Sequence, residues 1–253
     1  MSGVSAQKGS PSTPATSGLI IERTADVLSF TLNDPQHGNA VTGSMFDAML
    51  AELRMETRRP RARVLRIRAR GNVFCTGRER AGRNSAGIRR ESKRLIEVKR
   101  RLRNLPLISV AEVQGDALGF GFGFAIVCDF ALVAESAALG FPEMRSGLPP
   151  SAIMAYLGEY TLPRFAFPLV LFGDAITPAY ALQIGLISQV CAAERLAHDA
   201  DALVERILRL DGAAVRGCKE FFLSAQQNSF AANCRLATKV LTSDSLAVLK
   251  KRK

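Results

Sequence analysis

The sequence contains few of the residues that build metal sites, disulfide frameworks or nucleophile–histidine sites. It has two histidines, His37 and His198, and its five cysteines are widely spaced, with no CxxC pair. We therefore expect neither a structural zinc site nor disulfides, and we expect a reducing, cytoplasmic setting. No serine or cysteine nucleophile motif accompanies either histidine, so both are expected to be structural or to face solvent.

Long apolar runs and aromatic residues are also scarce. The longest apolar stretch, residues 117–134, carries Asp129 and three glycines, which favours a buried core element over a membrane span. The first residues have neither the basic start nor the apolar block of a signal peptide. The chain has no tryptophan and three tyrosines, so the sequence gives no sign of an aromatic platform for stacking nucleic-acid bases.

Positive charge is what the chain has in excess. Its net charge is +11, and residues 54–70 alone contain eight arginines. Such a surface attracts anions, among them nucleic acid, acidic lipid and phosphorylated small molecules. A predicted helix over residues 85–104 carries basic residues all round and no interleaved aromatics. This pattern is typical of a solvated helix that attracts phosphates, and we do not expect nucleic acid as a partner.

Hydrophobic patterning divides the chain into three parts. Residues 1–18 are rich in Ser, Thr, Pro and Gly and are predicted to form a disordered tail. Residues 19–192 alternate strand-like and helix-like segments, which predicts an α/β layered core with partly parallel strands. Residues 193–253 are predicted to form helices that pack outside the core or on another subunit. The predicted strands are 19–23, 27–32, 64–69, 107–113, 129–134, 138–141 and 186–190. One predicted helix is capped by Thr42. The other predicted helices are 85–104, 151–159, 164–172, 178–184, 193–209, 213–226 and 231–248.

A run of glycines at positions 115, 119, 121 and 123 follows the predicted strand 107–113 and opens a further helix. The first N–H groups of a helix have no partner within it, and bare backbone leaves them accessible to a developing oxyanion. Such a run can equally serve close packing of a helix on a sheet. Eighteen residues after Gly123 begins Phe141-Pro142-Glu143, which places a carboxylate behind a rigid proline. An anion cradle and one carboxylate are the minimum for chemistry beside a carbonyl.

Six motifs in this order resemble those of the crotonase, or enoyl-CoA hydratase/isomerase, superfamily, over nearly all of residues 19–253. Each motif is weak alone, and the ordered set is specific. The motifs are Thr31-Leu32-Asn33-Asp34-Pro35 with Asn39-Ala40, Phe74-Cys75-Thr76-Gly77-Arg78-Glu79, Val113-Gln114-Gly115-Asp116-Ala117-Leu118-Gly119, Cys128-Asp129, Phe141-Pro142-Glu143 with Gly147-Leu148, and Tyr180-Ala181 to Gly185-Leu186-Ile187.

The resemblance implies a crotonase-like spiral of ββα units over 19–192 and a C-terminal helical oligomerisation region over 193–253. It implies an acyl-CoA substrate, a homotrimer or dimer of trimers, and no separate cofactor, since coenzyme A enters with the thioester. It also implies an oxyanion hole made by the backbone N–H groups of Arg78 and Phe120, with Gly121 as the neighbouring candidate. The residues implied in substrate or CoA binding are Asn39, Ala40, Cys75, Gly77 and Gly119.

The chain departs from the family pattern at one catalytic position. Where hydratases of the family keep their first glutamate, this chain has Gly123, whereas the second, the implied catalytic Glu143, is retained. Hydration normally shares a water and a proton between two carboxylates. Moving a double bond needs one base and an oxyanion hole, so the residues favour isomerisation of an enoyl-CoA.

Two alternatives stay open. The chain could be a hydratase with a non-standard second acid, for which Glu159 is a candidate, or a non-catalytic homologue that binds acyl-CoA or RNA. A second departure concerns the acyl pocket. Where hydratases carry a Pro-Gly-x-Gly-Gly loop, residues 148–153 lack those glycines, and Ile153 and Met154 are expected to make the pocket narrower and more apolar.

Overall fold

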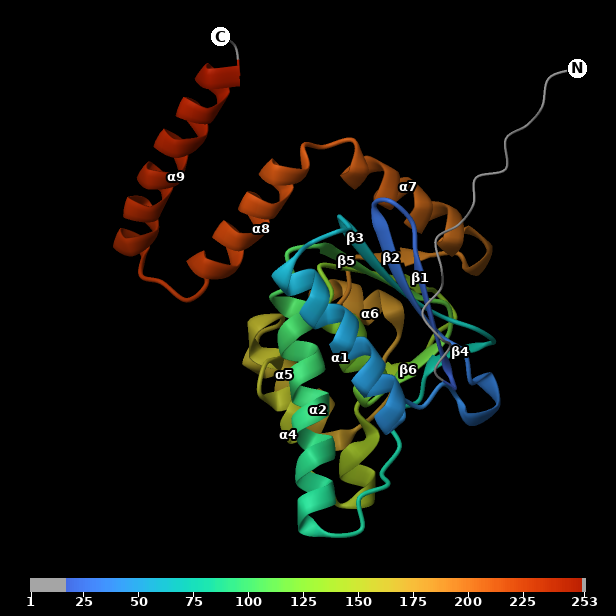
Figure 1. The fold of residues 1–253 in the computed structure, drawn as a ribbon. Coiled ribbons are helices and arrows are strands. Elements are labelled where there is room, and N and C mark those ends of the chain that lie inside the picture. The colour runs from blue at the N-terminus through green and yellow to red at the C-terminus, as the bar shows by residue number, and fades with distance from the viewer. Residues whose placement is uncertain (1–16, 252–253) are drawn as a thin grey trace, which may run out of the picture. The chain divides into compact units, whose positions relative to one another are not determined.

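The computed structural model describes the backbone of residues 17–251 and the side chains of residues 17–243. Residues 1–16 of the predicted disordered tail lie outside this range. The chain divides into two compact units, Met1–Leu210 and Asp211–Lys253. Figure 1 follows the elements of each unit along the chain.

A six-stranded sheet forms the centre of the larger unit. Its strands lie in the order β1-β2-β3-β5-β7-β9, and all neighbours are parallel except the antiparallel β1–β2 pair. The turn between β1 and β2 is closed by Thr24 N–H, which donates to Val27 O at 2.9 Å. The predicted hairpin is therefore confirmed. The strand bounds are β1 (Leu19–Arg23), β2 (Val27–Leu32), β3 (Val64–Ala69), β5 (Ile108–Val113), β7 (Phe130–Ala134) and β9 (Gln189–Cys191).

A second, three-stranded parallel sheet consists of β4 (Val73–Cys75), β6 (Asp116–Leu118) and β8 (Leu139–Gly140). Each of these strands comes directly after a strand of the large sheet. Helix α2 (Ser85–Arg103) follows β4, and α3 (Phe120–Ile126) follows β6. The chain thus repeats two strands and a helix, as predicted. The short strand β6, inside the glycine run, is an element that the sequence did not predict.

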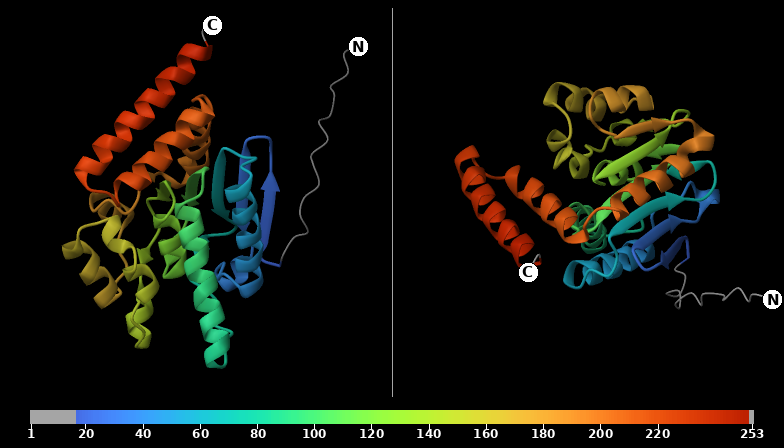
Figure 2. Two further views of the ribbon diagram at one scale, coloured as in Figure 1. Left: turned by 60° about the vertical axis from the view of Figure 1, so that its left-hand side comes forward. Right: turned by 90° about the horizontal axis from the view of Figure 1, so that it is seen from above.

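Both faces of the large sheet are buried, as is usual for parallel strands. Along β3, Leu65 and Ile67 contribute to a core shared with α1 (Gly43–Arg58) and α2, while Val64 belongs to a second core shared with α7 (Leu196–Leu208). This alternation follows the pleat of the strand. Helices α1 and α2 pack side by side (Figure 1), and α7 lies over the sheet against β3, β5 and β7 (Figure 2).

Side-chain caps fix where α1 and α2 begin. Thr42 Oγ1 accepts a hydrogen bond from Met45 N–H at 3.3 Å, which confirms the predicted cap of α1. Asn84 Oδ1 accepts from Gly87 N–H at 2.9 Å at the start of α2. These bonds satisfy amides that the helices leave unpaired at their starts. The buried residues of α2 are Leu95, Val98, Lys99 and Leu102.

Two predicted elements differ from the structure. The predicted strand 186–190 is displaced toward the C-terminus to β9, because Gly185 turns the chain at φ 81° and Leu186 and Ile187 enter the core instead. The predicted helix 151–159 breaks into α4 (Ser151–Met154) and the 3₁₀ turn η3 (Leu157–Glu159). The remaining helices of this unit are α5 (Pro163–Phe172) and α6 (Pro178–Gln183).

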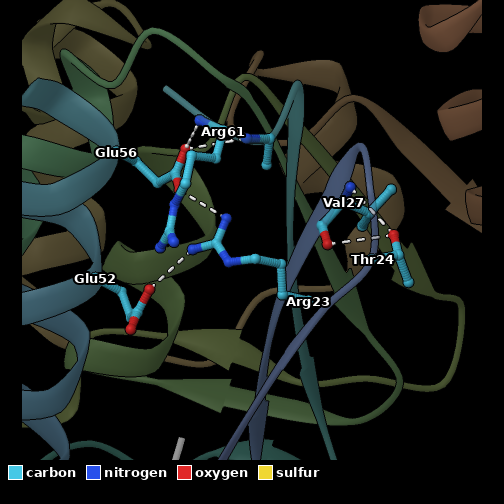
Figure 3. A network of polar contacts seen from close by, with 7 residues as sticks. Arg23, Thr24, Val27, Glu52, Glu56 and Arg61 are labelled. Atoms are coloured by element: carbon cyan, nitrogen blue, oxygen red, sulfur yellow. Dashed lines mark hydrogen bonds and ion pairs between the residues drawn. The ribbon is translucent and has the colours of Figure 1, made fainter. Parts of the chain in front are cut away.

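A charged network ties β1 to α1 (Figure 3). Arg23 donates to Glu56 Oε1 at 2.6 Å and to Glu52 Oε2 at 2.9 Å. The other carboxylate oxygen of Glu56 accepts from the backbone N–H groups of Arg61 and Ala62 at 2.8 and 3.1 Å. The Glu56 side chain is 0% exposed, so its three donors, Arg23 and the backbone N–H groups of Arg61 and Ala62, replace the water that it loses.

The smaller unit consists of α8 (Gly212–Ala225) and α9 (Phe230–Lys251). Asp211 caps α8, because its carboxylate accepts from the N–H groups of Ala213 and Ala214, both at 2.9 Å. Asn233 Nδ2 donates to Ala225 O at 2.9 Å and links the start of α9 to the end of α8. Helices were predicted over 213–226 and 231–248, and both are confirmed. In the part of the chain that the structure describes, no helix is long and apolar enough to cross a bilayer.

Candidate active site

The site is built where two parallel strands of the small sheet end together. Cys75 at the end of β4 pairs with Ala117 in β6, so the segments that follow, 76–78 and 119–121, leave the sheet side by side. On the first segment, Val41 N–H donates to Gly77 O at 3.1 Å, and Glu79 N–H donates to Val41 O at 3.0 Å. A parallel bridge of this form leaves the N–H of the residue between, Arg78, on the side away from Val41.

The second segment offers the unpaired amides of a helix start. Gly119 adopts φ 52° before α3, and its own N–H donates to Gly140 O at 2.8 Å. The first bond of the helix runs from Gly123 N–H to Gly119 O at 3.1 Å. The N–H groups of Phe120 and Gly121 therefore precede the first helical bond and have no partner within α3.

Gly121 lets these two segments approach each other. A Cβ at this position would lie 2.3 Å from Cys75 O and 2.6 Å from Cys75 Cβ, so no larger residue fits without movement of the backbone. Cys75 itself is buried, and its thiol donates to Gly77 O at 3.2 Å. Burial raises the pKa of the Cys75 thiol to about 12. Cys75 is thus a protonated packing residue beneath the pocket, and it does not line the cavity.

A cavity of about 790 Å³ opens over the two segments. Helix α2 forms one wall, and residues 148–153 form another. Its lining residues in the described part of the chain are Thr76, Gly77, Arg78, Arg80, Gly82, Ile88, Glu91, Ser92, Leu95, Ile96, Lys99, Gly119, Phe120, Pro142, Glu143, Arg145, Ser146, Leu148, Pro149, Pro150, Ser151, Ala152 and Ile153.

Glu143 projects a carboxylate next to the start of α3. It lies on the 3₁₀ turn η2 (Pro142–Ser146), which Pro142 begins. A Cβ on Gly119 would lie 2.9 Å from Glu143 Oε1, so glycine leaves room for the carboxylate. Glu143 Oε2 is buried and has no hydrogen-bond partner among the described residues. A buried carboxylate oxygen without a partner is rare outside functional sites.

Lys99 and Tyr156 fill the space beside Gly123. A Cβ at position 123 would lie 2.5 Å from Lys99 Nζ and 2.6 Å from the Tyr156 hydroxyl. Lys99 Nζ donates to this hydroxyl, which donates in turn to Gly123 O at 3.1 Å. The ammonium also lies 5.1 Å from the centre of the Phe120 ring. Burial lowers the pKa of Lys99 to about 7, against the opposing effects of Glu143 and Cys75.

Lys99 is the site residue that the sequence analysis missed, because it was counted with the basic residues of the helix 85–104. A signal was present in its spacing. Lys99 lies four residues after Leu95 and three before Leu102, so it shares their apolar face of the helix. A lysine on the buried stripe of an amphipathic helix is exceptional.

The structure places five of the nine predicted site residues in the cavity lining. Gly77, Arg78, Gly119, Phe120 and Glu143 line the cavity. The remaining predicted site residues, which do not line it, are Asn39, Ala40, Cys75 and Gly121.

Asn39 has a structural task in the loop before α1. Its side chain is 0% exposed and accepts from Asp34 N–H at 2.8 Å. It donates to Arg70 O and Val73 O at 2.9 and 2.7 Å, which holds the start of β4 in place. These bonds leave its amide no free hydrogen for a ligand.

Two further expectations for the pocket are wrong. Glu159, the candidate second acid, pairs with Arg103 and does not belong to the cavity lining. Met154 is 46% exposed and turns away from the cavity, whereas Ile153 lines it and lies 3.4 Å from the position of a Cβ on Gly123. Both histidines face solvent, as expected, with side chains 76% and 72% exposed.

Part of the positive charge of α2 is paired within the protein. Arg94 bonds to Asp47 at 2.5 Å, and Arg100 and Arg101 both bond to Glu97, at 2.9 and 2.5 Å. These pairs reduce the net positive charge that α2 presents to a polyanion, which weakens the case for RNA binding.

The chain is similar to known proteins over most of its length. A family model described as enoyl-CoA hydratase/isomerase matches residues 22–247. The 2,3-dehydroadipyl-CoA hydratase of Escherichia coli K12 is 28% identical over 219 residues, which are 83% of this chain and 84% of the relative. An enoyl-CoA isomerase/hydratase of Mycosarcoma maydis is 28% identical over 210 residues, 76% of this chain and 75% of the relative. A Thermobifida fusca YX structure in complex with CoA superposes with a TM-score of 0.83 at 28% identity, covering 92% of this chain and 95% of that one.

Proposed function

Because the chain belongs to the enoyl-CoA hydratase/isomerase family, we propose that it moves the double bond of an enoyl-CoA thioester by way of an enolate. The observation that carries this proposal is the unpaired carboxylate of Glu143, which lies in the cavity next to the start of α3. A base and an oxyanion hole are what removal of an α-proton requires.

In the proposed reaction, the thioester oxygen accepts hydrogen bonds from the N–H groups of Arg78 and Phe120. Glu143 removes a proton from the α-carbon, and the electron pair moves to the thioester oxygen to give a dienolate. A proton is then returned further along the chain, and the double bond becomes conjugated with the thioester. Donors fixed on the backbone stabilise the dienolate without reorganising, which is worth about 3 kcal/mol for one such donor.

Hydration fits the cavity less well. The space beside Gly123, where a second carboxylate would project, is filled by Lys99 and Tyr156. Glu91 is the other carboxylate of the cavity lining, and it lies 3.3 Å from the Arg78 guanidinium. The described site therefore has one unpaired carboxylate to share between a water and a proton. A hydratase with a non-standard second acid stays the alternative, since a relative is named for hydration.

The cavity also has features that suit an acyl-CoA. Arg80 is exposed and lines the cavity, where it can meet the phosphates of coenzyme A, and the exposed Arg145, also in the lining, pairs with Asp174 at 2.8 Å. Leu148, Pro149 and Ile153 supply an apolar surface for the acyl chain. A homotrimer or dimer of trimers and a cytoplasmic location remain predictions from the sequence.

Incubation with 3-enoyl-CoA and with 2-enoyl-CoA tests the proposal. We expect conversion of the 3-enoyl substrate to the conjugated 2-enoyl product, with hydration of 2-enoyl-CoA slow or absent. Glu143→Gln should lower the isomerisation rate by a factor of about 10² to 10⁴, the usual contribution of a general base. Glu159→Gln is the matched control, because Glu159 lies outside the cavity lining, and it should isomerise like the wild type.

Two results would contradict the proposal. One is a 3-enoyl substrate left untouched while 2-enoyl-CoA is hydrated at rates typical of the family. The other is an isomerisation rate that Glu143→Gln leaves unchanged.

A further inference from the structure

Lys99 is a buried ammonium group inside the cavity, and the reaction described above does not use it. The residue is 4% exposed, and it contributes to the lining of the cavity. Lysine is rarely buried without a carboxylate partner, because removing its charge from water costs free energy. Among the described residues, Nζ has one hydrogen-bond acceptor, the Tyr156 hydroxyl, and two aromatic rings, of Phe120 and Tyr156, whose centres lie at 5.1 and 4.9 Å.

The contacts hold Nζ at one point of the cavity. Tyr156 is fixed by its bond to Gly123 O, and it receives the bond from Lys99. The ammonium has three hydrogens, of which this bond uses one. Aromatic faces attract the cation on the sides where no acceptor lies. A lysine held in this way has protons available to a group bound in the cavity.

Lys99 and Glu143 both lie against the start of α3. Glu143 Oε1 lies beside Gly119, and Lys99 Nζ lies beside Gly123, one helical turn further on. Phe120, Glu143 and Lys99 line the same cavity, so an acyl chain whose thioester oxygen is bound by Phe120 N–H would have both side chains within that cavity.

We propose that Lys99, positioned by Tyr156, is the proton donor that completes the isomerisation at the far end of the dienolate, so that Glu143 acts only as the base. This inference rests on the proposed function. It assigns a catalytic role to Lys99 and a positioning role to Tyr156.

The proposed step balances in protons and electrons. Glu143 takes the proton from C2, and the C–H electron pair becomes part of the dienolate. The dienolate then takes a proton from the Lys99 ammonium at C4, which forms the C4–H bond, restores the thioester carbonyl and leaves a neutral amine. The proton on Glu143 passes to this amine directly or through solvent, and both groups return to their starting states.

The electrostatic surroundings of Lys99 suit a proton donor at neutral pH. Burial lowers its pKa to about 7, while the negative charge of Glu143 on η2 and the Cys75 thiol on β4 oppose that shift. Tyr156, whose pKa burial raises well above its usual value, stays protonated and serves as the fixed partner. An acid whose pKa lies near the working pH donates its proton readily while still carrying it for part of the time.

The decisive experiment follows a label from C2. A 3-enoyl-CoA carrying two deuterium atoms at C2 is converted in ordinary water, and deuterium at C4 of the product is measured by mass spectrometry or NMR. If Lys99 is the donor, the wild type places solvent hydrogen at C4, because an ammonium exchanges its protons rapidly with water. Lys99→Met should turn over about 10²-fold more slowly or worse, and its residual product should carry deuterium that Glu143 moved from C2 to C4.

Two further variants complete the experiment. Lys93→Met makes the same change on the exposed side of α2, outside the cavity lining, and should match the wild type in rate and label. Tyr156→Phe removes the hydroxyl that positions Lys99, and it should lower turnover while still placing solvent hydrogen at C4.

A second readout separates the failure of this inference from failure of the proposed function. Exchange of the C2 hydrogens of a saturated acyl-CoA in D₂O needs only Glu143 and the backbone N–H groups, so Lys99→Met should retain it. A Lys99→Met variant with wild-type turnover and label distribution would overturn the role of Lys99. Loss of the C2 exchange in that variant would also overturn it, since Lys99 would then act on the first step or on folding. A wild type with neither exchange nor isomerisation would overturn the proposed function itself, and this inference with it.

Discussion

Replacement of Gly121 by alanine tests whether two backbone segments form one oxyanion hole. The two proposed donors are main-chain N–H groups, which side-chain mutagenesis cannot remove. Gly121→Ala acts on their separation, because its Cβ would lie 2.3 Å from Cys75 O and 2.6 Å from Cys75 Cβ. Ordinary contacts of a Cβ begin at 3.4 Å. The start of α3 must therefore move away from the end of β4 by roughly 1 Å, a displacement that can cost about 10²-fold in rate.

We expect kcat/KM of Gly121→Ala to fall by about 10²-fold, with unfolding destabilised by about 1–3 kcal/mol from overpacking. Gly158→Ala is the matched control, since its Cβ meets no atom within 4 Å and its φ is not in the left-handed region. Both variants restrict the unfolded chain in the same way. Steady-state kinetics and urea unfolding of the three proteins supply the comparison. A folded Gly121→Ala protein with wild-type kcat/KM would refute the idea that this close approach sets the oxyanion hole.

Two predictions concern stability. Glu56→Ala removes the acceptor of Arg23 Nη1 and of two backbone N–H groups, while Arg23 keeps its bond to Glu52, and it should cost about 3 kcal/mol in urea unfolding. Glu22→Ala, at a side chain 62% exposed, should stay within about 0.5 kcal/mol of the wild type. Lys99 has a pKa of about 7 when folded and its usual 10.5 when unfolded, so the unfolded chain binds more protons between these values. Wild-type stability relative to Lys99→Met should therefore rise between pH 7 and 10.5, by up to about 5 kcal/mol, and parallel pH curves would contradict the depressed pKa.

Local patterns in the sequence predicted those strands and helices whose own residues show a regular alternation or a capping side chain. Alternation predicted β3 to the residue, and the hydroxyl of Thr42 marked the start of α1. The strand predicted over 186–190 was displaced, because Leu186 and Ile187 are buried in a turn and have the same apolar character as strand residues. Short apolar runs do not distinguish these two environments.

Some residues of the site were predicted from motifs in the sequence, and others are brought together only by the fold. The Phe-Pro-Glu motif led to Glu143, and the resemblance to the family led to Arg78 and Phe120; the structure places all three on one cavity. Lys99 and Tyr156 come from segments 57 residues apart, and their bond depends on how α2 packs against the segment after α4. No local sequence pattern predicts the contact between Lys99 and Tyr156. Glu159 was the candidate for a second acid, but its partner is Arg103.

The filled space beside Gly123 also constrains how this sequence can evolve. A glutamate introduced there alone would collide with Lys99 Nζ and the Tyr156 hydroxyl, at 2.5 and 2.6 Å from its Cβ. An ancestor with two carboxylates could lose one by a single substitution and then fill the vacated volume. The reverse path requires the Lys99 ammonium and the Tyr156 hydroxyl to shift away from this position, or residues 99 and 156 to change. The packing around this glycine therefore couples the residue at position 123 to those at positions 99 and 156, so that substitutions at the three positions are not independent.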